Sequence, residues 1–583
     1  MNAFTFLCAS FAGRAHAFSD FFWDNKIFQT EQWEGIIIFI RLLLTLGGAF
    51  LLVYEARARK LGEPLRKRTI RRWAIGLSVV AFCSYFDFYN AHTRYAEYYH
   101  RHEFYHYYLG AKYNREVGYV RLYECTQLAE LELRGPEEMK KREVRDLRVN
   151  LIIPTTDSIV FNSPAACKSH FNDERWGAFK KDVDWFYNSA RGEYWENMQK
   201  DHGYNPPPVW TMTGKFFASF APAGDGFFKL LACVDVLFHI GTLVMMWWAF
   251  GWRVGLVTAL FWGVNGPANF YWTGGAFLRQ DWLFLFVAAV CLARKQKFGL
   301  AGAALMWSAL LRVFPVIAFF GWGVMIAIHV FRRWQAYRAG EVPTQGNWAL
   351  DSWLRPEHQR LIGGAIIAAS VLIPASIVVA GPESYREFYQ HTLHTHDNTP
   401  LTNHMGLRSI MAHSWDSRMR FGRNDNLDDP FQEWKQGRID RNSAQKPIRF
   451  ALIGFIALWT AWSLRKTKLL WVGVIMSVPL LMCTTELTCY YYSFFMVAAA
   501  LIRQRPTLGP PLLAVSGASQ IVLHSFYWVD DKFVAMSYLY LLLSILMLFA
   551  YSRPFSAVRL RAWIEKKREP AIAGGQRELN LTP

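Results

Sequence analysis

The sequence predicts an all-α membrane protein that crosses the bilayer about 13 times and carries a large folded loop on the outer side. Hydrophobic residues make up 52% of the 583 residues. They are gathered in blocks of roughly 20 residues, the length that a helix needs to span a bilayer. The Lys and Arg residues behind the net charge of +18 cluster between these blocks, as they do in cytoplasmic loops. Long polar segments separate some of the blocks, which predicts sizeable parts outside the bilayer.

The N-terminal part, residues 1–72, is predicted to hold one span, at about 35–55, followed by a basic loop. Eight Lys and Arg residues lie between Arg57 and Arg72, which predicts a cytoplasmic loop and an N-terminus outside. Residues 73–551 are predicted to form the transmembrane domain. The C-terminal part, 552–583, is predicted to be a basic cytoplasmic tail that anionic lipid would hold.

Two long segments are predicted to be extracytoplasmic, residues 90–225 and 381–447. The first is too long for a loop without its own structure, so we expect a small folded lobe there. Its sequence includes an apolar, strand-like run at 149–154. The lobe also holds Cys125 and Cys167, and an oxidising compartment would allow these two to pair. The alternative for this pair is two buried free thiols.

Residues 85–123 form an unusual polar segment directly after the second span. Tyrosines and histidines alternate here with carboxylates at Asp87, Glu97, Glu103 and Glu116. Tyr rings favour the membrane–water boundary, because one end of the ring is polar and the other apolar. We therefore expect a helical segment against the outer face of the membrane, carrying either functional carboxylates or an aromatic belt with solvated charges.

Arg312 is a candidate site residue because of its place in an apolar stretch. The stretch has basic ends and must cross twice, and the residue before Pro315 is disfavoured in a helix. The turn between the two spans is therefore expected at 312–315, on the outer side. An Arg at such a position is costly unless it meets a partner or a wet cavity.

The unusual polar groups all fall on the same predicted side of the membrane. They are the 85–123 segment, the run 279–281 (Arg-Gln-Asp), Arg312 and five histidines between His391 and His413. Together they would suit an anionic lipid-linked substrate, with Arg and His holding a phosphate and a carboxylate acting as base. We expect no cofactor. A divalent metal at the histidine cluster stays open as the alternative, although the segment lacks the carboxylate pattern that is typical of zinc hydrolases.

Four motifs, in this order and spacing, resemble the membrane glycosyltransferases of the GT-C superfamily, closest to the polyprenyl-phosphomannose-dependent mannosyltransferases of glycosyltransferase family 87. Residues 103–123, an acid followed by aromatic residues, Gly and Leu-Tyr, are similar to the first outer loop of that family. Residues 278–281 resemble its Gly-Gln helix start, with Arg in place of Gly. Residues 301–315 resemble its Gly-rich helix ending in a basic residue and Pro, and 403–409 its late outer motif.

The resemblance implies an inverting transfer of a mannose-like sugar from a polyprenyl-phosphate donor to a glycan or lipid acceptor. The reaction would take place on the outer side of the bacterial inner membrane, among membrane lipids. An acid in the first outer loop would be the base, and both Glu103 and Asp87 are candidates. The candidate donor-binding residues are Lys112, His106, Tyr107, Arg279, Gln280, Arg312, Asn403, His404 and Arg408.

Two other classes remain open. A flippase or transporter for a lipid-linked glycan would show inverted repeats and charges at mid-membrane, and the sequence has no such repeat. A glycan polymerase or ligase would share the chemistry but take a pyrophosphate-linked oligosaccharide. The sequence contains no nucleic-acid-binding motif, so we do not expect nucleic acid as a partner.

Overall fold

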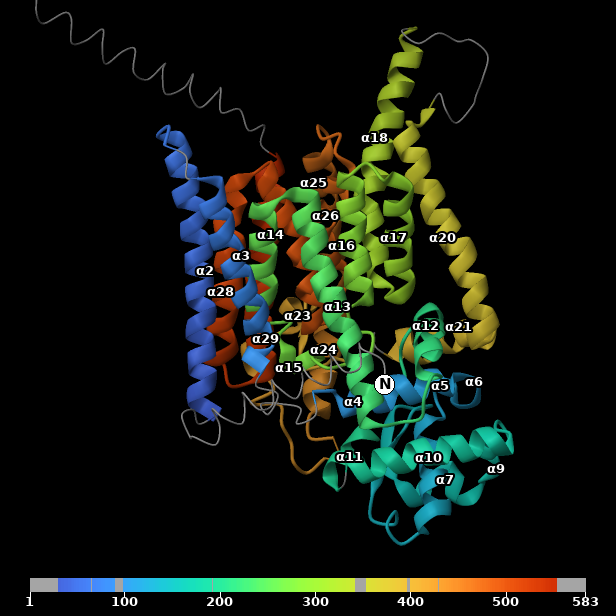
Figure 1. Cartoon of the computed structure of the whole chain (residues 1–583). Helices are drawn as coiled ribbons and strands as arrows, with labels where there is room; N and C mark the ends of the chain where they lie inside the picture. The colour runs from blue at the N-terminus through green and yellow to red at the C-terminus, as the bar shows by residue number, and fades with distance from the viewer. Residues whose placement is uncertain are drawn as a thin grey trace, which may run out of the picture.

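The computed structural model describes residues 30–63, 66–89, 98–190, 192–340, 353–395, 399–427 and 429–552. About 75% of the model is helical, and the sheets of the described part are two short two-stranded ribbons. Figure 1 shows a bundle of nearly parallel helices with a helical lobe at one end of it. The structure therefore agrees with the predicted all-α class.

Within the described residues, six helical segments are long and apolar enough to cross a membrane, with 19 to 26 residues each. At about 1.5 Å per residue, 19 residues span roughly 28 Å, close to the thickness of a hydrocarbon core. These segments belong to α2 (Thr30–Lys60), α13 (Asp225–Phe250), η5 (Phe314–Ala318) with α18 (Phe319–Arg338), α20 (Pro356–Ala380), α25 (Lys446–Leu464) and α29 (Val529–Ser552). They make the protein a membrane-embedded one.

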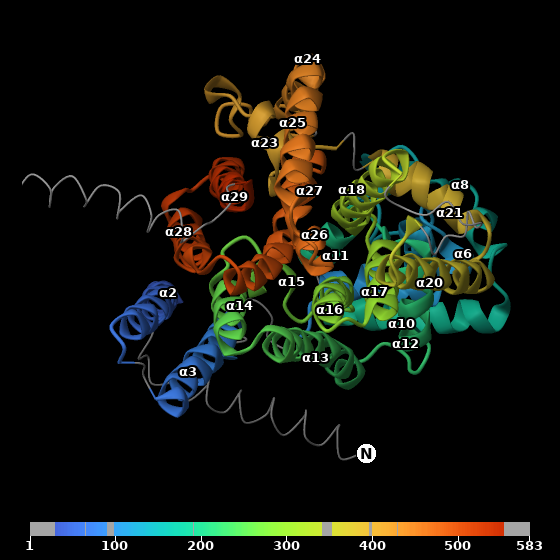
Figure 2. The ribbon, with the colours of Figure 1, turned by 90° about the horizontal axis from the view of Figure 1, so that it is seen from above.

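Further helices complete the bundle. They are α3 (Lys67–Tyr85), α14 (Trp252–Val264), α16 (Asp281–Arg294), α17 (Phe298–Leu311), α26 (Leu470–Met476), α27 (Val478–Thr484), η8 (Cys489–Arg503), η9 (Pro506–Leu508) and α28 (Gly509–Ser525). Of these, α14, α16, α26 and α27 lie in the interior of the bundle (Figure 2). Each predicted span has a helix, but the count of 13 crossings stays a prediction.

One predicted span is shorter than expected. The apolar run at about 254–272 predicts one span, whereas α14 ends at Val264 and the short α15 (Phe270–Thr273) follows. The physical reason lies in Gly266 and Pro267, because Gly is unfavourable in a helix interior and Pro disfavours helix for the residue before it. The chain between the two helices lies inside the bundle, where the Gly266 amide donates to the Ser519 hydroxyl.

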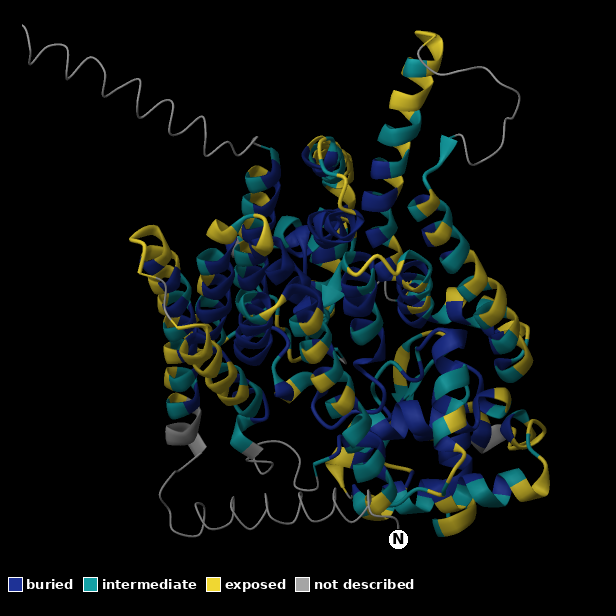
Figure 3. Ribbon diagram, turned by 45° about the horizontal axis from the view of Figure 1, so that its top comes forward, coloured by how far each residue is buried: buried dark blue, intermediate teal, exposed yellow. Residues whose placement is uncertain are grey.

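Exposed residues lie on the outer helices of the bundle (Figure 3), and many of them are large and apolar. Phe50 of α2 is 69% exposed, Val378 of α20 is 72% exposed and Leu458 of α25 is 73% exposed. Soluble monomers rarely leave such large apolar surfaces open to water. These faces are suited to lipid.

The two ends of the bundle differ in charge and in size. The turn between α2 and α3, rich in Lys and Arg, lies at the same end as the last turn of α18 and the start of α20 (Figure 1). The lobe built from residues 98–223 lies at the opposite end. This arrangement agrees with the predicted placement of basic loops and lobe on opposite sides. Which end faces the cytoplasm stays a prediction.

The lobe is a folded unit of short helices, and its two longest helices pack against each other. Its helices are α4 (Arg101–Phe104), η3 (Tyr105–Leu109), α5 (Gly110–Lys112), α6 (Asn114–Val117), α7 (Leu122–Arg134), η4 (Thr155–Asp157), α8 (Ile159–Asn162), α9 (Ala165–Lys168), α10 (Asp173–Ser189), α11 (Glu193–Met198) and α12 (Pro208–Ala218). Phe179, Phe186 and Trp195 are buried in its core. The predicted strand is present as β2 (Leu151–Pro154), antiparallel to β1 (Glu143–Asp146).

The second outer segment packs on the bundle at the lobe end. It contains α21 (Glu383–Glu387), η6 (Phe388–Leu393), β3 (His404–Met405), α23 (Leu407–Ala412), η7 (Trp415–Ser417) and α24 (Gln432–Ala444). Strand β3 pairs with β4 (Leu487–Thr488), which fixes 403–409 beside the turn that precedes η8.

The predicted pairing of Cys125 and Cys167 is present in the lobe as a disulfide, with Cα atoms 5.5 Å apart. It links α7 to α9 and closes a loop of 42 residues. A loop of this size corresponds to about 3–4 kcal/mol of stabilisation. We therefore expect Cys125→Ser to lower the thermal unfolding midpoint of the lobe by several degrees, measured by tryptophan fluorescence.

Cys83→Ser serves as the control, because Cys83 is a half-buried free cysteine of α3. Thiol labelling of the denatured, unreduced protein should leave Cys125 and Cys167 unmodified. Labelling of both residues in the native chain would contradict the disulfide.

Candidate active site

A cavity of about 1330 Å³ lies where the lobe meets the bundle. Its wall comes from the helix that begins at residue 101, from the segment after α11, and from the turns before α16, η5, α23 and η8. These segments are far apart in the sequence and meet because the lobe covers one end of the bundle (Figure 1). The polar residues in the wall include Glu103, His106, Tyr107, Asp201, Arg279, Arg312, Asn403, His404, Arg408, Glu486, Tyr490 and Tyr491.

Glu103 and Arg279 form a two-pronged ion pair in this wall. The Arg279 Nε atom lies 2.8 Å from Glu103 Oε2, and its Nη2 donates to Glu103 Oε1 at 2.9 Å. The Arg279 guanidinium also lies over the rings of Tyr107 and Tyr490, at 4.4 and 5.3 Å from their centroids. Such a pair is geometrically specific, so it fixes the Glu103 carboxylate at the cavity surface.

The position of Arg279 is set by a buried carboxylate in α13. Asp235 accepts hydrogen bonds from the backbone amides of Arg279 and Gln280, at 2.9 and 3.1 Å. The preceding Leu278 has φ = 49°, a left-handed conformation that costs a non-glycine residue about 1–3 kcal/mol. Asp235 and the Trp210 indole, which donates to the Leu278 carbonyl at 3.0 Å, hold this turn in place.

Arg312 is buried with part of its guanidinium unsatisfied. The residue is 5% exposed, and Nη1 donates to the Leu311 carbonyl at 2.8 Å. Nε and Nη2 have no hydrogen-bond partner among the described residues, although both are buried. Because a buried, unsatisfied charge is costly, it points to a ligand that completes its hydrogen bonds. The side chain lines the cavity, so an anion bound there would be that ligand.

A second charged cluster surrounds Glu486, in the turn before η8. Arg408 Nε lies 3.2 Å and Arg438 Nη2 3.5 Å from its carboxylate, and the Ser409 hydroxyl donates to it at 2.9 Å. His404 Nδ1 is 3.9 Å away. Burial alone would raise the pKa of Glu486, but these cations outweigh the burial and lower it. Three basic groups around one carboxylate leave positive charge toward the cavity.

Most of the predicted site residues meet in the cavity. Its wall contains Glu103, His106, Tyr107, Arg279, Arg312, Asn403, His404 and Arg408. The break in the helix before Pro315 is also present, because α17 ends at Leu311 and η5 begins at Phe314. Local sequence rules were sufficient for this turn.

Asp87, the second candidate base, lies elsewhere. It forms an ion pair with Arg41 of α2 at 2.7 Å and is not part of the described cavity wall. Arg41 is 6% exposed and also donates to the Ser84 carbonyl at 2.6 Å. This pairing joins α2 to the end of α3.

Lys112 and Gln280 are also outside the described cavity wall. The Lys112 ammonium donates to Asp182 of α10 at 2.8 Å and to the Tyr108 hydroxyl at 2.7 Å, which attaches α5 to the core of the lobe. The Gln280 side chain donates to the Thr273 hydroxyl at 3.3 Å, inside the bundle. In these positions both side chains bind neighbouring elements of the protein.

Sequence reasoning missed Asp235, Asp201 and Arg438. Asp235 could have been found, because a carboxylate inside the apolar helix 225–250 is a site candidate by default. Glu486 is the centre of the cluster with Arg408 and Arg438. No local signal pointed to Arg438, because it lies in a polar helix and reaches Glu486 only through the fold.

Comparisons of the chain with protein-family models, with curated proteins and with solved structures find no match. The fold and the cavity therefore define the general class of protein. The protein is an all-helical, membrane-embedded protein with a polar, cation-lined cavity under a folded lobe.

Proposed function

We propose that the protein is a membrane glycosyltransferase that moves a sugar from a polyprenyl-phosphate donor to a glycan or lipid acceptor. One observation carries the proposal: the unsatisfied Arg312 guanidinium and the Glu103 carboxylate line the same cavity. A phosphate would complete the hydrogen bonds of Arg312, and a carboxylate can accept the proton of an acceptor hydroxyl. The resemblance to family 87 points to a mannose-like sugar.

The same cavity has an apolar flank that suits a prenyl chain. Val313 and Val316 of the 312–318 turn are 43% and 48% exposed, and Phe450 of α25 is 57% exposed. All three line the cavity. A donor with its phosphate at Arg312 could place its chain between these side chains and continue into lipid.

In the proposed reaction, the acceptor oxygen attacks the anomeric carbon from the side opposite the phosphate, with inversion. The bond between this carbon and the phosphate oxygen breaks, and polyprenyl phosphate leaves. Arg312 stabilises the charge on the leaving phosphate. A hydrogen-bond donor that is already in place where charge develops lowers the barrier of the reaction. Glu103 takes the hydroxyl proton, and Arg279 holds its carboxylate in position.

The test is a transfer assay with purified full-length protein and a panel of radiolabelled polyprenyl-phosphate sugars, run with mixed glycan and lipid acceptors. We expect transfer from at least one monophosphate-linked sugar. Transfer from a pyrophosphate-linked oligosaccharide alone would favour a polymerase or ligase. Movement of an intact lipid-linked glycan across vesicles, without transfer, would favour a flippase.

A further inference from the structure

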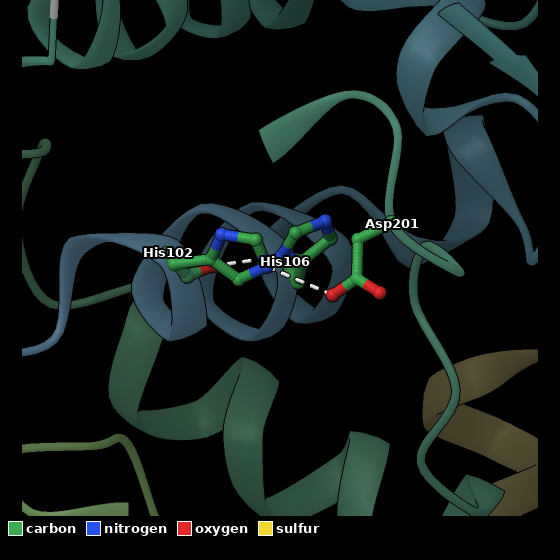
Figure 4. Close-up of side chains that lie close together, drawn as sticks. All are labelled: His102, His106 and Asp201. Carbon is green, nitrogen blue, oxygen red and sulfur yellow. Dashed lines mark hydrogen bonds and ion pairs between the residues drawn. The ribbon is translucent and has the colours of Figure 1, made fainter. Parts of the chain in front are cut away.

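Two histidines and a carboxylate meet at the rim of the cavity, on the lobe side. His102 belongs to α4 and His106 to η3, one helical turn apart, while Asp201 follows α11. His102 Nε2 lies 2.8 Å from Asp201 Oδ2, and one potential ligand atom from each of the three lies within 4.8 Å of the others. Figure 4 shows both rings and the carboxylate turned toward one another.

This donor set is typical of transition metals. Two imidazole nitrogens and one carboxylate oxygen bind Zn²⁺ at about 2.0–2.2 Å, and three protein ligands leave a fourth position open. Tetrahedral ligands lie about 3.3 Å apart at such bond lengths, so the three groups need only a small movement. The side chains of His102 and Asp201 are 24% and 46% exposed, and this exposure gives them room to move.

His106 has the surroundings of a metal-bound histidine. Its Nε2 lies 2.7 Å from the Tyr123 hydroxyl, and the Gly203 amide donates to that hydroxyl at 3.0 Å. Histidine ligands usually give their second ring N–H to an oxygen of this kind. Burial, with a smaller effect of His102, lowers the pKa of His106 to about 4, so the ring is neutral at pH 7, as a ligand must be.

One rearrangement is required on binding. Nδ1 of His106 lies 2.7 Å from the His102 carbonyl oxygen and meets it as a donor. A metal at Nδ1 takes the place of this proton, and the neutral ring then carries its proton on Nε2, facing the Tyr123 hydroxyl oxygen. The ring therefore changes tautomer without changing charge.

The described residues bring together one other group of this kind, His413 with Asp530 and Asp531. Its carboxylates already have strong partners: Arg418 lies 3.3 Å from Asp531, and the Met419 amide donates to Asp530 at 2.7 Å. A cation there would compete with Arg418.

We propose that His102, His106 and Asp201 form a binding site for a divalent transition-metal ion of the Zn²⁺ type, with its open position toward the cavity. The ion would tie the segment after α11 to the helix that carries Glu103. Water or an oxygen of a cavity ligand would fill the fourth position. This site differs from the histidine cluster that the sequence analysis considered for metal, and it does not rest on the glycosyl-transfer proposal.

The test measures zinc on the full-length protein in detergent, after removal of metal with a chelator and without any donor present. Zinc titration by calorimetry and metal content by mass spectrometry should give one ion per chain. His102→Gln and Asp201→Asn should each weaken zinc binding at least about tenfold. Both positions are partly exposed, so these variants are expected to fold, which size-exclusion chromatography will check.

His202→Gln is the matched control. His202 lines the same cavity next to Asp201, and its Nδ1 lies 3.0 Å from the Asn150 side-chain oxygen, outside the triad. It should bind zinc like the unchanged protein. Absence of stoichiometric zinc in the unchanged protein, or unchanged affinity in both His102→Gln and Asp201→Asn, would overturn the proposal. Because no donor is present, either result leaves the transferase proposal untouched.

Discussion

Arg312→Met is expected to abolish donor binding while leaving the donor-free protein as stable as before, or more stable. Met has a similar reach and no charge, so it fills the same space without an unsatisfied guanidinium. Losing one partner of a buried charged pair costs about 2–5 kcal/mol, which is roughly 30-fold to several thousand-fold in affinity. The measurement is binding of a short-chain polyprenyl-phosphate sugar, together with the thermal unfolding midpoint without donor.

The opposite responses of binding and stability make this test specific. If Arg312 had a structural role, its loss would lower the unfolding midpoint, because a satisfied buried ion would be broken. Arg418→Met is the control: this residue is 12% exposed at its side chain and is paired with Asp531, outside the described cavity wall. It should lose stability and keep donor affinity. Normal donor binding in Arg312→Met would remove the main support for a phosphate site.

The elements that depend on local chemistry could be predicted from the sequence. The turn at 312–315 follows from Pro315, and the lobe follows from the length of the polar segment. The pairing of Cys125 with Cys167 was within reach because these are the two cysteines of that segment. In each case the information lies in a single stretch of sequence.

The contacts that make the site could not be predicted, because they join distant residues. Glu103 and Arg279 are 176 positions apart, and the sequence around either residue does not indicate that the other is its partner. Lys112 is one of the candidate donor-binding residues, but its ammonium pairs with Asp182, which lies 70 positions further on. The same limit applied to Asp87, whose partner Arg41 lies in the preceding helix. The pattern of charges along the sequence predicts on which side of the membrane a segment lies. Tertiary packing decides which of the charged side chains form ion pairs within the protein.

Glu103→Gln is expected to reduce turnover by about 10²–10⁴-fold, the usual contribution of a general base. Gln keeps the shape of the side chain and can still accept a hydrogen bond from Arg279, so the cavity wall should stay in place. Donor affinity should therefore change little, and the loss should appear in kcat. The measurement is single-turnover transfer with the donor that the panel identifies.

Asp87→Asn is the matched control, because it makes the same chemical change in a carboxylate paired with an arginine. Asp87 bonds Arg41 between α2 and α3 and is not part of the described cavity wall, so we expect lower stability and near-normal turnover. A second readout separates a base from a positioning residue. A base is needed for the chemical step alone, so Glu103→Gln should lower the single-turnover rate and leave donor affinity unchanged. If Glu103→Gln turns over normally, while Asp87→Asn binds the donor but is inactive, then Asp87 is the base. Normal turnover in both variants would exclude carboxylate-assisted transfer at this site.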